Sequence, residues 1–259
     1  MSERGVPTDT GADRAPSPTH AARPPRPGGH PEPDAVRRRA VRRRHALVVA
    51  LTFVTGSADA MGFLALGGAF SSVMTGNMVL LGLSAGAADA ELAMTSGGAI
   101  LAFVGGLLVG AHVAGSPRPD DPTWPRRVTR ALQLELAVFV VFLVGWEITG
   151  GDRSDRLQLA LLMLSAVALG MQSSAVQRFG VNGLSSTYLT GTLTSLIGDL
   201  AARRPHTSWL PRGQVLVMLM TGAAVSALTT VHLPRLAPVL CVVPLGVVAL
   251  GARRIVGEV

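Results

Sequence analysis

The sequence predicts an all-α polytopic membrane protein with about six transmembrane helices plus two short re-entrant or half-helix segments, arranged as two internally related halves. Three observations support this prediction. Only 15% of the 259 residues are charged, whereas a soluble domain usually carries about 25%. Long apolar runs recur along the chain, and two shorter, more polar runs interrupt them at similar places. This composition excludes an ordinary cytosolic enzyme.

The charged residues are concentrated before the first apolar run. Residues 1–44 hold 10 of the 23 basic residues and eight of the 17 prolines, so we expect a disordered cytoplasmic tail rich in Pro and Arg. Its last eight residues, 37–44, include six Arg. Such a block favours a cytoplasmic N-terminus and could attract anionic lipid.

The positive charge does not predict a nucleic-acid partner. All 23 basic residues are Arg, in a chain that is also rich in Ala and Gly. We attribute this bias to a genome rich in G and C. Basic loops that face the cytoplasm explain the charge better. We therefore expect a multi-pass protein of the cell inner (plasma) membrane, in contact with membrane lipid.

Six apolar segments are long enough to cross a bilayer, which takes about 20 residues. The first half of the membrane domain, residues 45–150, holds three of them, and the second half, residues 151–259, holds the other three. The segments are Ala46–Leu66, Leu92–Val113, Leu132–Ile148, Leu157–Val176, Val215–Val231 and Leu236–Leu250.

Two shorter segments, Val73–Ala88 and Tyr188–Leu200, either cross as well or re-enter the membrane. Charge placement separates the two alternatives. Of the 19 Arg from Arg37 onward, eight crossings leave 13 inside and six crossings leave 16 inside. The positive-inside rule therefore favours six crossings by a margin of three residues.

The two short segments resemble each other. Met74-Thr75-Gly76-Asn77 matches Leu189-Thr190-Gly191-Thr192, and a polar motif lies about 20 residues before each. Each half is then a span, a Thr-Gly segment, a span rich in small residues and another span. This order is typical of duplicated transporters. Three crossings per half make the repeat inverted, and four make it parallel.

The motifs are similar to those of the YoaK-type family of bacterial membrane proteins, a domain of unknown function. The resemblance rests on Gly56-Ser57-Ala58-Asp59-Ala60, on Met74-Thr75-Gly76-Asn77, on Gly170-Met171-Gln172 and on Thr187-Tyr188-Leu189-Thr190-Gly191-Thr192-Leu193. It covers residues 45–255, and it implies a multi-spanning inner-membrane protein. Ser173-Ser174 stand where the family motif more often has Asn-Ala, which leaves an amide role there unsupported.

Asp59 lies inside the first span, where a charge is costly unless it faces protein or water. One interpretation is a carboxylate that binds a proton or a cation. The other is a structural carboxylate that caps backbone N–H groups of the Thr-Gly segment. The two interpretations are compatible, because the N-terminal end of a half-helix is also an anion site.

The Thr-Gly segments predict a polar site within an apolar wall. Two facing half-helices would expose backbone groups near the midplane, which is tolerated only beside protein or a water-filled cavity. The alternative is that Thr and Gly serve close helix packing. The tentative substrate-binding residues are Asp59, Thr75, Gly76, Asn77, Gln172, Thr190, Gly191 and Thr192.

Other polar residues receive simpler interpretations. Glu135, near the start of the third crossing, is expected to reach the lipid headgroups. Asp199 is expected to pair locally with Arg203 and Arg204. Gly106 and Gly110 form a GxxxG pair, which would serve internal packing or a homodimer contact equally well.

Enzyme functions are not supported. Protease, lipase and nucleotide-binding motifs are absent from the sequence. Cys241, the single cysteine, lies in an apolar run and is expected to pack there. We predict no catalytic residue, no metal site and no cofactor.

The predicted function is a small-solute transporter or permease of unknown substrate, with Asp59 coupling to protons. The alternatives are a non-transporting membrane protein that binds lipid or a partner protein through its Arg-rich tail, and a passive channel.

Overall fold

The structure is a computed structural model that describes residues 33–115, 125–149, 154–178 and 189–257. Within these ranges the chain forms eight α-helices and one 3-10 helix, and no strand. In chain order they are α1 (Pro33–Ala65), α2 (Met74–Ala87), α3 (Ala90–Ala114), α4 (Arg126–Ile148), α5 (Asp155–Gln177), α6 (Leu189–Ala201), α7 (His206–His232), η1 (Pro234–Leu236) and α8 (Val239–Gly257).

Six segments of the described chain are long and apolar enough to cross a membrane, and each overlaps one of the six predicted spans. The prediction of an all-helical polytopic fold is therefore confirmed. The helical segments begin up to six residues earlier than the predicted spans, because the first turns are polar. They are Val41–Ala65, Ala90–Ala114, Arg126–Ile148, Asp155–Gln177, Trp209–His232 and Pro234–Ala252.

The last part of the predicted tail is helical. Helix α1 already begins at Pro33, so residues 33–44 are helical. Proline is favoured in the first turn of a helix, and the following residues, rich in Arg and Ala, are good helix formers without another proline. Residues 1–32 lie outside the described residues.

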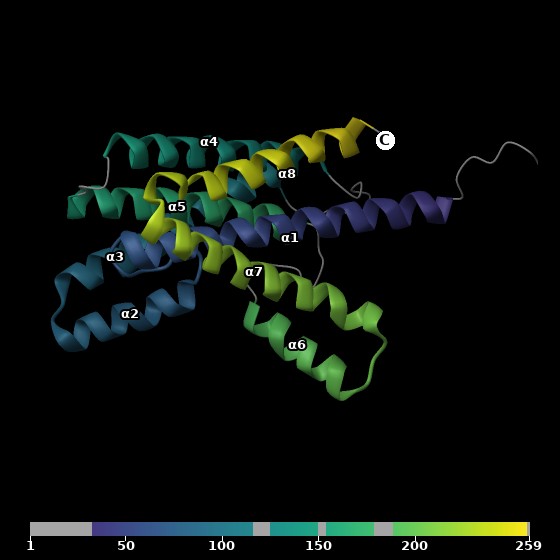
Figure 1. Cartoon of the computed structure of the whole chain (residues 1–259), viewed down its shortest axis with the longest axis horizontal. Coiled ribbons are helices and arrows are strands. Elements are labelled where there is room, and N and C mark those ends of the chain that lie inside the picture. The colour runs from purple at the N-terminus through teal and green to yellow at the C-terminus, as the bar shows by residue number, and fades with distance from the viewer. Residues whose placement is uncertain (1–32, 116–124, 150–153, 179–188, 258–259) are drawn as a thin grey trace, which may run out of the picture.

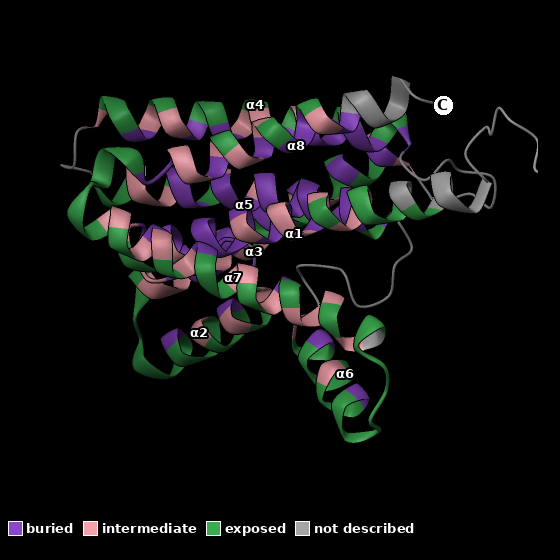
Figure 2. Cartoon of the chain, turned by 45° about the vertical axis from the view of Figure 1, so that its right-hand side comes forward, coloured by how far each residue is buried: buried purple, intermediate pink, exposed green. Residues whose placement is uncertain are grey.

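Four helices, α1, α4, α5 and α8, pack around the core. α5 packs on α4, α8 packs on both α1 and α4, and α1 meets α5. α7 lies along α1, and α3 lies along α5, in the two most extensive contacts of the fold (Figure 1). α1 and α5 are the most deeply buried spans (Figure 2).

The contact between α1 and α7 brings the two backbones together. A Cβ atom at Gly56 would overlap the carbonyl oxygen of Leu219, and a Cβ atom at Gly222 would overlap that of Phe53. Gly56 therefore faces the residue three positions before Gly222, and Gly222 faces the residue three positions before Gly56. No side chain larger than hydrogen fits at either position while the helices stay this close.

The contact between α3 and α5 has the same design. A Cβ atom at Gly170 would overlap the carbonyl oxygen of Phe103, and one at Gly106 would overlap that of Val167. The predicted close approach at Gly106 is thus used within the chain, against α5.

The short helices α2 and α6 lie on one side of the bundle (Figure 1). α2 folds back on α3, and α6 folds back on α7. Both begin near the middle of the molecule and extend toward opposite ends (Figure 1). With 14 and 13 residues they are about 20 Å long, which is shorter than the roughly 30 Å hydrocarbon core.

Most side chains of the two short helices face outward. The apolar residues Met78, Val79 and Leu83 of α2 and Ile197 of α6 are exposed. In a bilayer these side chains would contact lipid. The few buried residues of each short helix are polar, and they belong to the contacts described next.

Candidate functional site

Asp59 is buried less than two turns before the end of α1, and both of its carboxylate oxygens have a partner. Oδ1 accepts a hydrogen bond from the backbone N–H of Ser72 at 2.7 Å, and Oδ2 accepts one from the Ser72 hydroxyl at 2.6 Å. Ser72 lies in the connection that leads into α2. The carboxylate therefore fastens the connection one residue before the predicted segment Val73–Ala88.

Asn77 fastens the same connection from the other side. Its Nδ2 donates to the carbonyl oxygen of Phe70 at 2.7 Å, and its Oδ1 accepts from the N–H of Phe70 at 2.9 Å. The side chain is fully buried. Asp59 and Asn77 together hold the α1–α2 connection in one conformation, so the structure brings these two predicted residues to one site.

The other residues of the first Thr-Gly segment are more open. Thr75 is exposed, and Gly76 lies against the side chains of Phe70 and Val73. Neither is part of the hydrogen-bonded connection. Both lie in the first turn of α2, where backbone N–H groups lack partners within the helix.

The second Thr-Gly segment forms the first turn of α6. Thr190 and Gly191 are exposed, and Thr192 is buried. The carbonyl oxygen of Thr190 accepts a hydrogen bond from the hydroxyl of Thr194 at 3.0 Å. The residues just before this turn, 179–188, lie outside the described residues.

Gln172 lies in the core between α5 and α1. Its Nε2 donates to the hydroxyl of Thr55 at 2.8 Å and to the carbonyl oxygen of Leu51 at 3.3 Å. Thr55 precedes Asp59 by one turn of α1. Gln172 is thus placed one turn from the buried carboxylate, on the core side of α1.

Glu135 is the residue that sequence reasoning placed wrongly. It does not reach the headgroups: its side chain is fully buried, and neither carboxylate oxygen has a hydrogen-bond partner in the described part of the chain. The signal was present in the spacing, because Leu132, Phe139, Phe142 and Trp146 are buried on the same face of α4.

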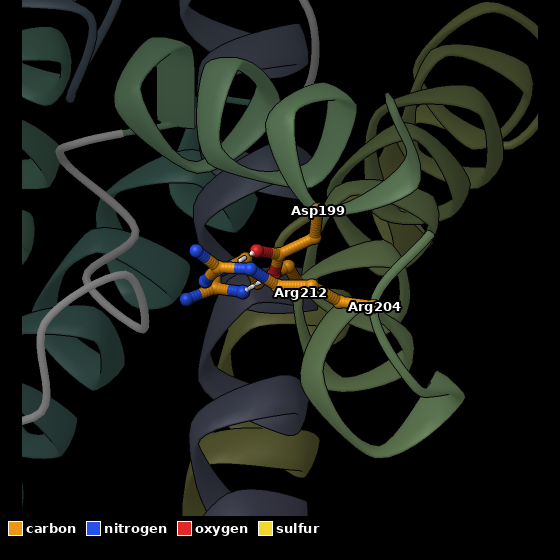
Figure 3. Close-up of polar contacts among 3 residues, drawn as sticks. All are labelled: Asp199, Arg204 and Arg212. Atoms are coloured by element: carbon orange, nitrogen blue, oxygen red, sulfur yellow. Dashed lines mark hydrogen bonds and ion pairs between the residues drawn. The ribbon is translucent and has the colours of Figure 1, made fainter. Parts of the chain in front are cut away.

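Asp199 is buried and binds two arginines (Figure 3). It pairs with Arg204 at 3.2 Å and with Arg212 in a shorter contact. The predicted pairing with Arg204 is confirmed, and Arg212 of α7 is an addition that the local spacing could not indicate. The cluster joins α6 to α7, so it has a structural role.

A shallow pocket of about 380 Å³ lies along the α2–α3 hairpin, between Leu81, Ser84, Asp89 and Ala93. It is lined by none of the predicted site residues. In the described residues there is no group of three or more His, Cys, Asp or Glu side chains that could hold a metal ion.

Comparison with known proteins identifies the family. The family model described as "Protein of unknown function (DUF1275)" matches residues 47–251. The "UPF0700 transmembrane protein YoaK" of Bacillus subtilis (strain 168) is 34% identical over 160 residues, which are 62% of this chain and 68% of that protein. No solved structure matches the chain. The chain is therefore a member of the YoaK-type DUF1275 family, and the resemblance seen in the motifs is confirmed.

Proposed function

We propose that the protein is a small-solute transporter or permease of the inner membrane, built from two inverted repeats. α1–α4 form one repeat and α5–α8 form the other. The observation that carries the proposal is the placement of α2 and α6, which start near the middle of the bundle and extend in opposite directions (Figure 1). Discontinuous helices in paired halves are the usual setting of a transport site.

The short helices support the repeat residue by residue. The buried residues of α2 are Asn77 and Ser84, and those of α6 are Thr192 and Asp199. The differences 192 − 77 and 199 − 84 are both 115. The same two positions of each short helix thus face the protein.

The turns after the short helices agree as well. The N–H of Asp89 donates to the carbonyl oxygen of Ser84 at 3.0 Å, and the N–H of Arg204 donates to that of Asp199 at 2.9 Å. The residue before each donor has a left-handed backbone, with φ of 55° at Ala88 and 50° at Arg203. A non-glycine residue rarely adopts this conformation, so its recurrence at equivalent positions favours duplication over coincidence.

The glycine contacts complete the correspondence. Gly56 in α1 matches Gly170 in α5, and Gly222 in α7 matches Gly106 in α3. α1 therefore packs on the third helix of the second half as α5 packs on the third helix of the first half. Such an exchange is expected when a two-fold axis relates the halves.

The arrangement suggests where a solute would bind. In the inverted topology the first turns of α2 and α6 lie near the midplane, with Thr75, Gly76 and Asn77 on one side and Thr190, Gly191 and Thr192 on the other. The exposed hydroxyls of Thr75 and Thr190, together with the partial positive charge at the N-terminus of each short helix, would bind a polar or anionic group. Asp59 would couple binding to a proton, and Gln172 would line the same path.

The test is transport by the purified protein in lipid vesicles. A dye inside the vesicles reports proton movement while amino acids, sugars, carboxylates and inorganic ions are added outside in turn. We expect one class to evoke flux that depends on the pH gradient, and Asp59→Asn to remove that dependence. Glu147→Gln, at an exposed carboxylate, is the control. If Asp59→Asn kept the pH dependence of wild type, the coupling role of Asp59 would be wrong.

A second candidate function is binding of lipid or a partner protein through the Arg-rich tail, without transport. The observation in its favour is that Arg38, Arg42 and Arg43 are exposed on the first turns of α1. Deleting residues 1–32 and neutralising these three Arg leaves the spans intact. Loss of cellular activity with normal membrane insertion and normal flux would favour this candidate.

A further inference from the structure

The core contains a carboxylic side chain that the contacts so far described do not use. Glu135 of α4 is 0% exposed, and both of its oxygens lack a hydrogen-bond partner within the described ranges. Asp59, in contrast, accepts two hydrogen bonds from Ser72. Glu135 and Asp59 are both buried, but their environments therefore differ.

The neighbouring helix supplies acceptors at the same depth. The Cβ position of Gly145 in α4 lies 3.1 Å from the Leu161 side chain of α5, and the two helices run antiparallel through the connection at residues 149–154. Counting ten residues from this contact back along α4 leads to Glu135, and counting ten residues forward along α5 leads to Met171. Because the helices are antiparallel, Glu135 lies at about the same depth in the bundle as Met171 and Gln172. The Oε1 atom of Gln172 is buried and also lacks a hydrogen-bond partner.

Helices α8 and α1 border the same part of the core. Cys241 of α8 is fully buried, with its sulfur 3.9 Å from the carbonyl oxygen of Val54. Glu135, Gln172 and Cys241 are thus three buried polar side chains on the neighbouring helices α4, α5 and α8, and we call them the polar layer.

Among the residues that the structure describes, no charged side chain forms a hydrogen bond or ion pair with Glu135. On α5 the nearest cation in sequence is Arg178, about two turns beyond Gln172. The arginines of α4 itself are exposed within its first five residues, and the arginines of α8, Arg253 and Arg254, come about three turns after Cys241 in the helix. The titratable groups of α3, Glu91 and His112, are exposed at its two ends.

A buried carboxylate anion without a partner is strongly disfavoured, and it becomes tolerable by binding a proton or a cation. A hard cation takes six or more oxygen ligands, whereas this layer offers the Glu135 carboxylate, one amide oxygen and a thiol. A proton needs only the carboxylate, and the resulting O–H needs one acceptor. Gln172 Oε1 is an unused acceptor at that depth.

We propose that Glu135 is a proton-binding site in the core, with Gln172 Oε1 as the acceptor for its O–H group. The proton comes from water and returns to water, and no other bond changes. A role of this proton in coupling rests on the proposed transport function. The proposal that Glu135 is protonated does not depend on transport.

The experiment labels the full-length protein, in vesicles, with dicyclohexylcarbodiimide. This apolar reagent adds to a protonated carboxyl group: the acid proton moves to a carbodiimide nitrogen, the carboxylate oxygen bonds to the central carbon, and the acyl group then migrates to nitrogen. We expect a stable adduct on the peptide that contains Glu135, at a level at least about tenfold above that at the exposed Glu147. The yield should fall as the pH is raised.

The controls make each outcome decisive. Asp59→Asn should keep the adduct at Glu135, and Glu135→Gln should remove it. If the second variant did not fold, the pH profile of the wild-type adduct would still decide. Absence of the adduct at every pH would overturn the proposal, and so would protection by sodium at constant pH, which would indicate a cation site. A Glu135 adduct without flux for any solute would support the proton site and count against transport.

Discussion

Asn77 illustrates how a polar residue inside a membrane domain can hold the backbone rather than a solute. Its amide forms two hydrogen bonds with the backbone of Phe70, so it replaces the partners that this irregular connection lacks. Apolar surroundings make such bonds hard to replace. The sequence predicted that Asn77 matters, but the pattern Thr-Gly-Asn cannot show what the amide binds.

We predict that Asn77→Ala destabilises the protein by about 1–3 kcal/mol, because the partly buried backbone N–H and C=O of Phe70 would lose their partner. Thermal unfolding in detergent, followed by light scattering and circular dichroism, measures the change. Thr75→Ala, at the exposed neighbour in the same turn, is the control and should unfold as wild type does. Equal midpoints for the two variants would show that the connection does not depend on Asn77.

Glu135 shows the limit of sequence reasoning at the residue scale. Its distance from the end of the apolar segment suggested the headgroup region. Helical phase decides instead, because Glu135 lies on the same face as Leu132 and Phe139, which are buried against the core. A wheel projection of α4 could have located it, whereas the missing hydrogen-bond partner is visible only in the fold.

At the scale of elements, glycine positions determine which helices touch. Gly56 and Gly170 meet carbonyl oxygens of the partner helices, while Gly105 has no atom within 4 Å of its Cβ position. The sequence predicted a face of small residues on α3 but could not separate internal packing from a contact between two copies. Within the chain, Gly106 and Gly110 pack on α5.

We predict that Gly56→Ala and Gly170→Ala each destabilise the bundle by about 1–3 kcal/mol, because the added methyl group forces the helices apart. Gly105→Ala should be neutral, or stabilising by up to about 1 kcal/mol through helix propensity. Unfolding by sodium dodecyl sulfate in mixed micelles, followed by circular dichroism, measures all three. A cost at Gly105 as large as at Gly56 would show that the described contacts do not determine the packing.

The element boundaries were predicted well where hydropathy changes sharply and less well where charged turns belong to a helix. α4 begins at Arg126, six residues before the apolar segment that predicted it. α1 begins at Pro33, inside the stretch that composition assigned to the tail. Arginine is a good helix former, so a polar composition alone does not mark a helix end.

For the whole molecule, the fold class follows from composition and apolar periodicity, and the six long helices confirm it. The sequence separates crossing from re-entry of the two short helices by a much smaller margin. The positive-inside rule separates six crossings from eight by three Arg residues. The length of α2 and α6 now favours re-entry, because about 20 Å of helix does not span the hydrocarbon core.

The inverted repeat is the central claim, because it places the two Thr-Gly segments on opposite sides of one site. With six crossings, α2 enters from the side where α1 ends, and α6 enters from the other side. With eight crossings, the two helices end on the same side. The exposed positions at their C-terminal ends, Ala87 and Ala202, are therefore the most informative reporters.

The most direct test is to place a single cysteine at Ala87 or Ala202 in a Cys241→Ala background and to label intact cells and inverted membrane vesicles with a membrane-impermeant maleimide. Ser154→Cys, in the α4–α5 connection, reports the side on which α4 ends. The inverted repeat predicts that Ala87→Cys and Ser154→Cys react in intact cells, while Ala202→Cys reacts only in inverted vesicles. Reaction of Ala87→Cys and Ala202→Cys from the same face would contradict it.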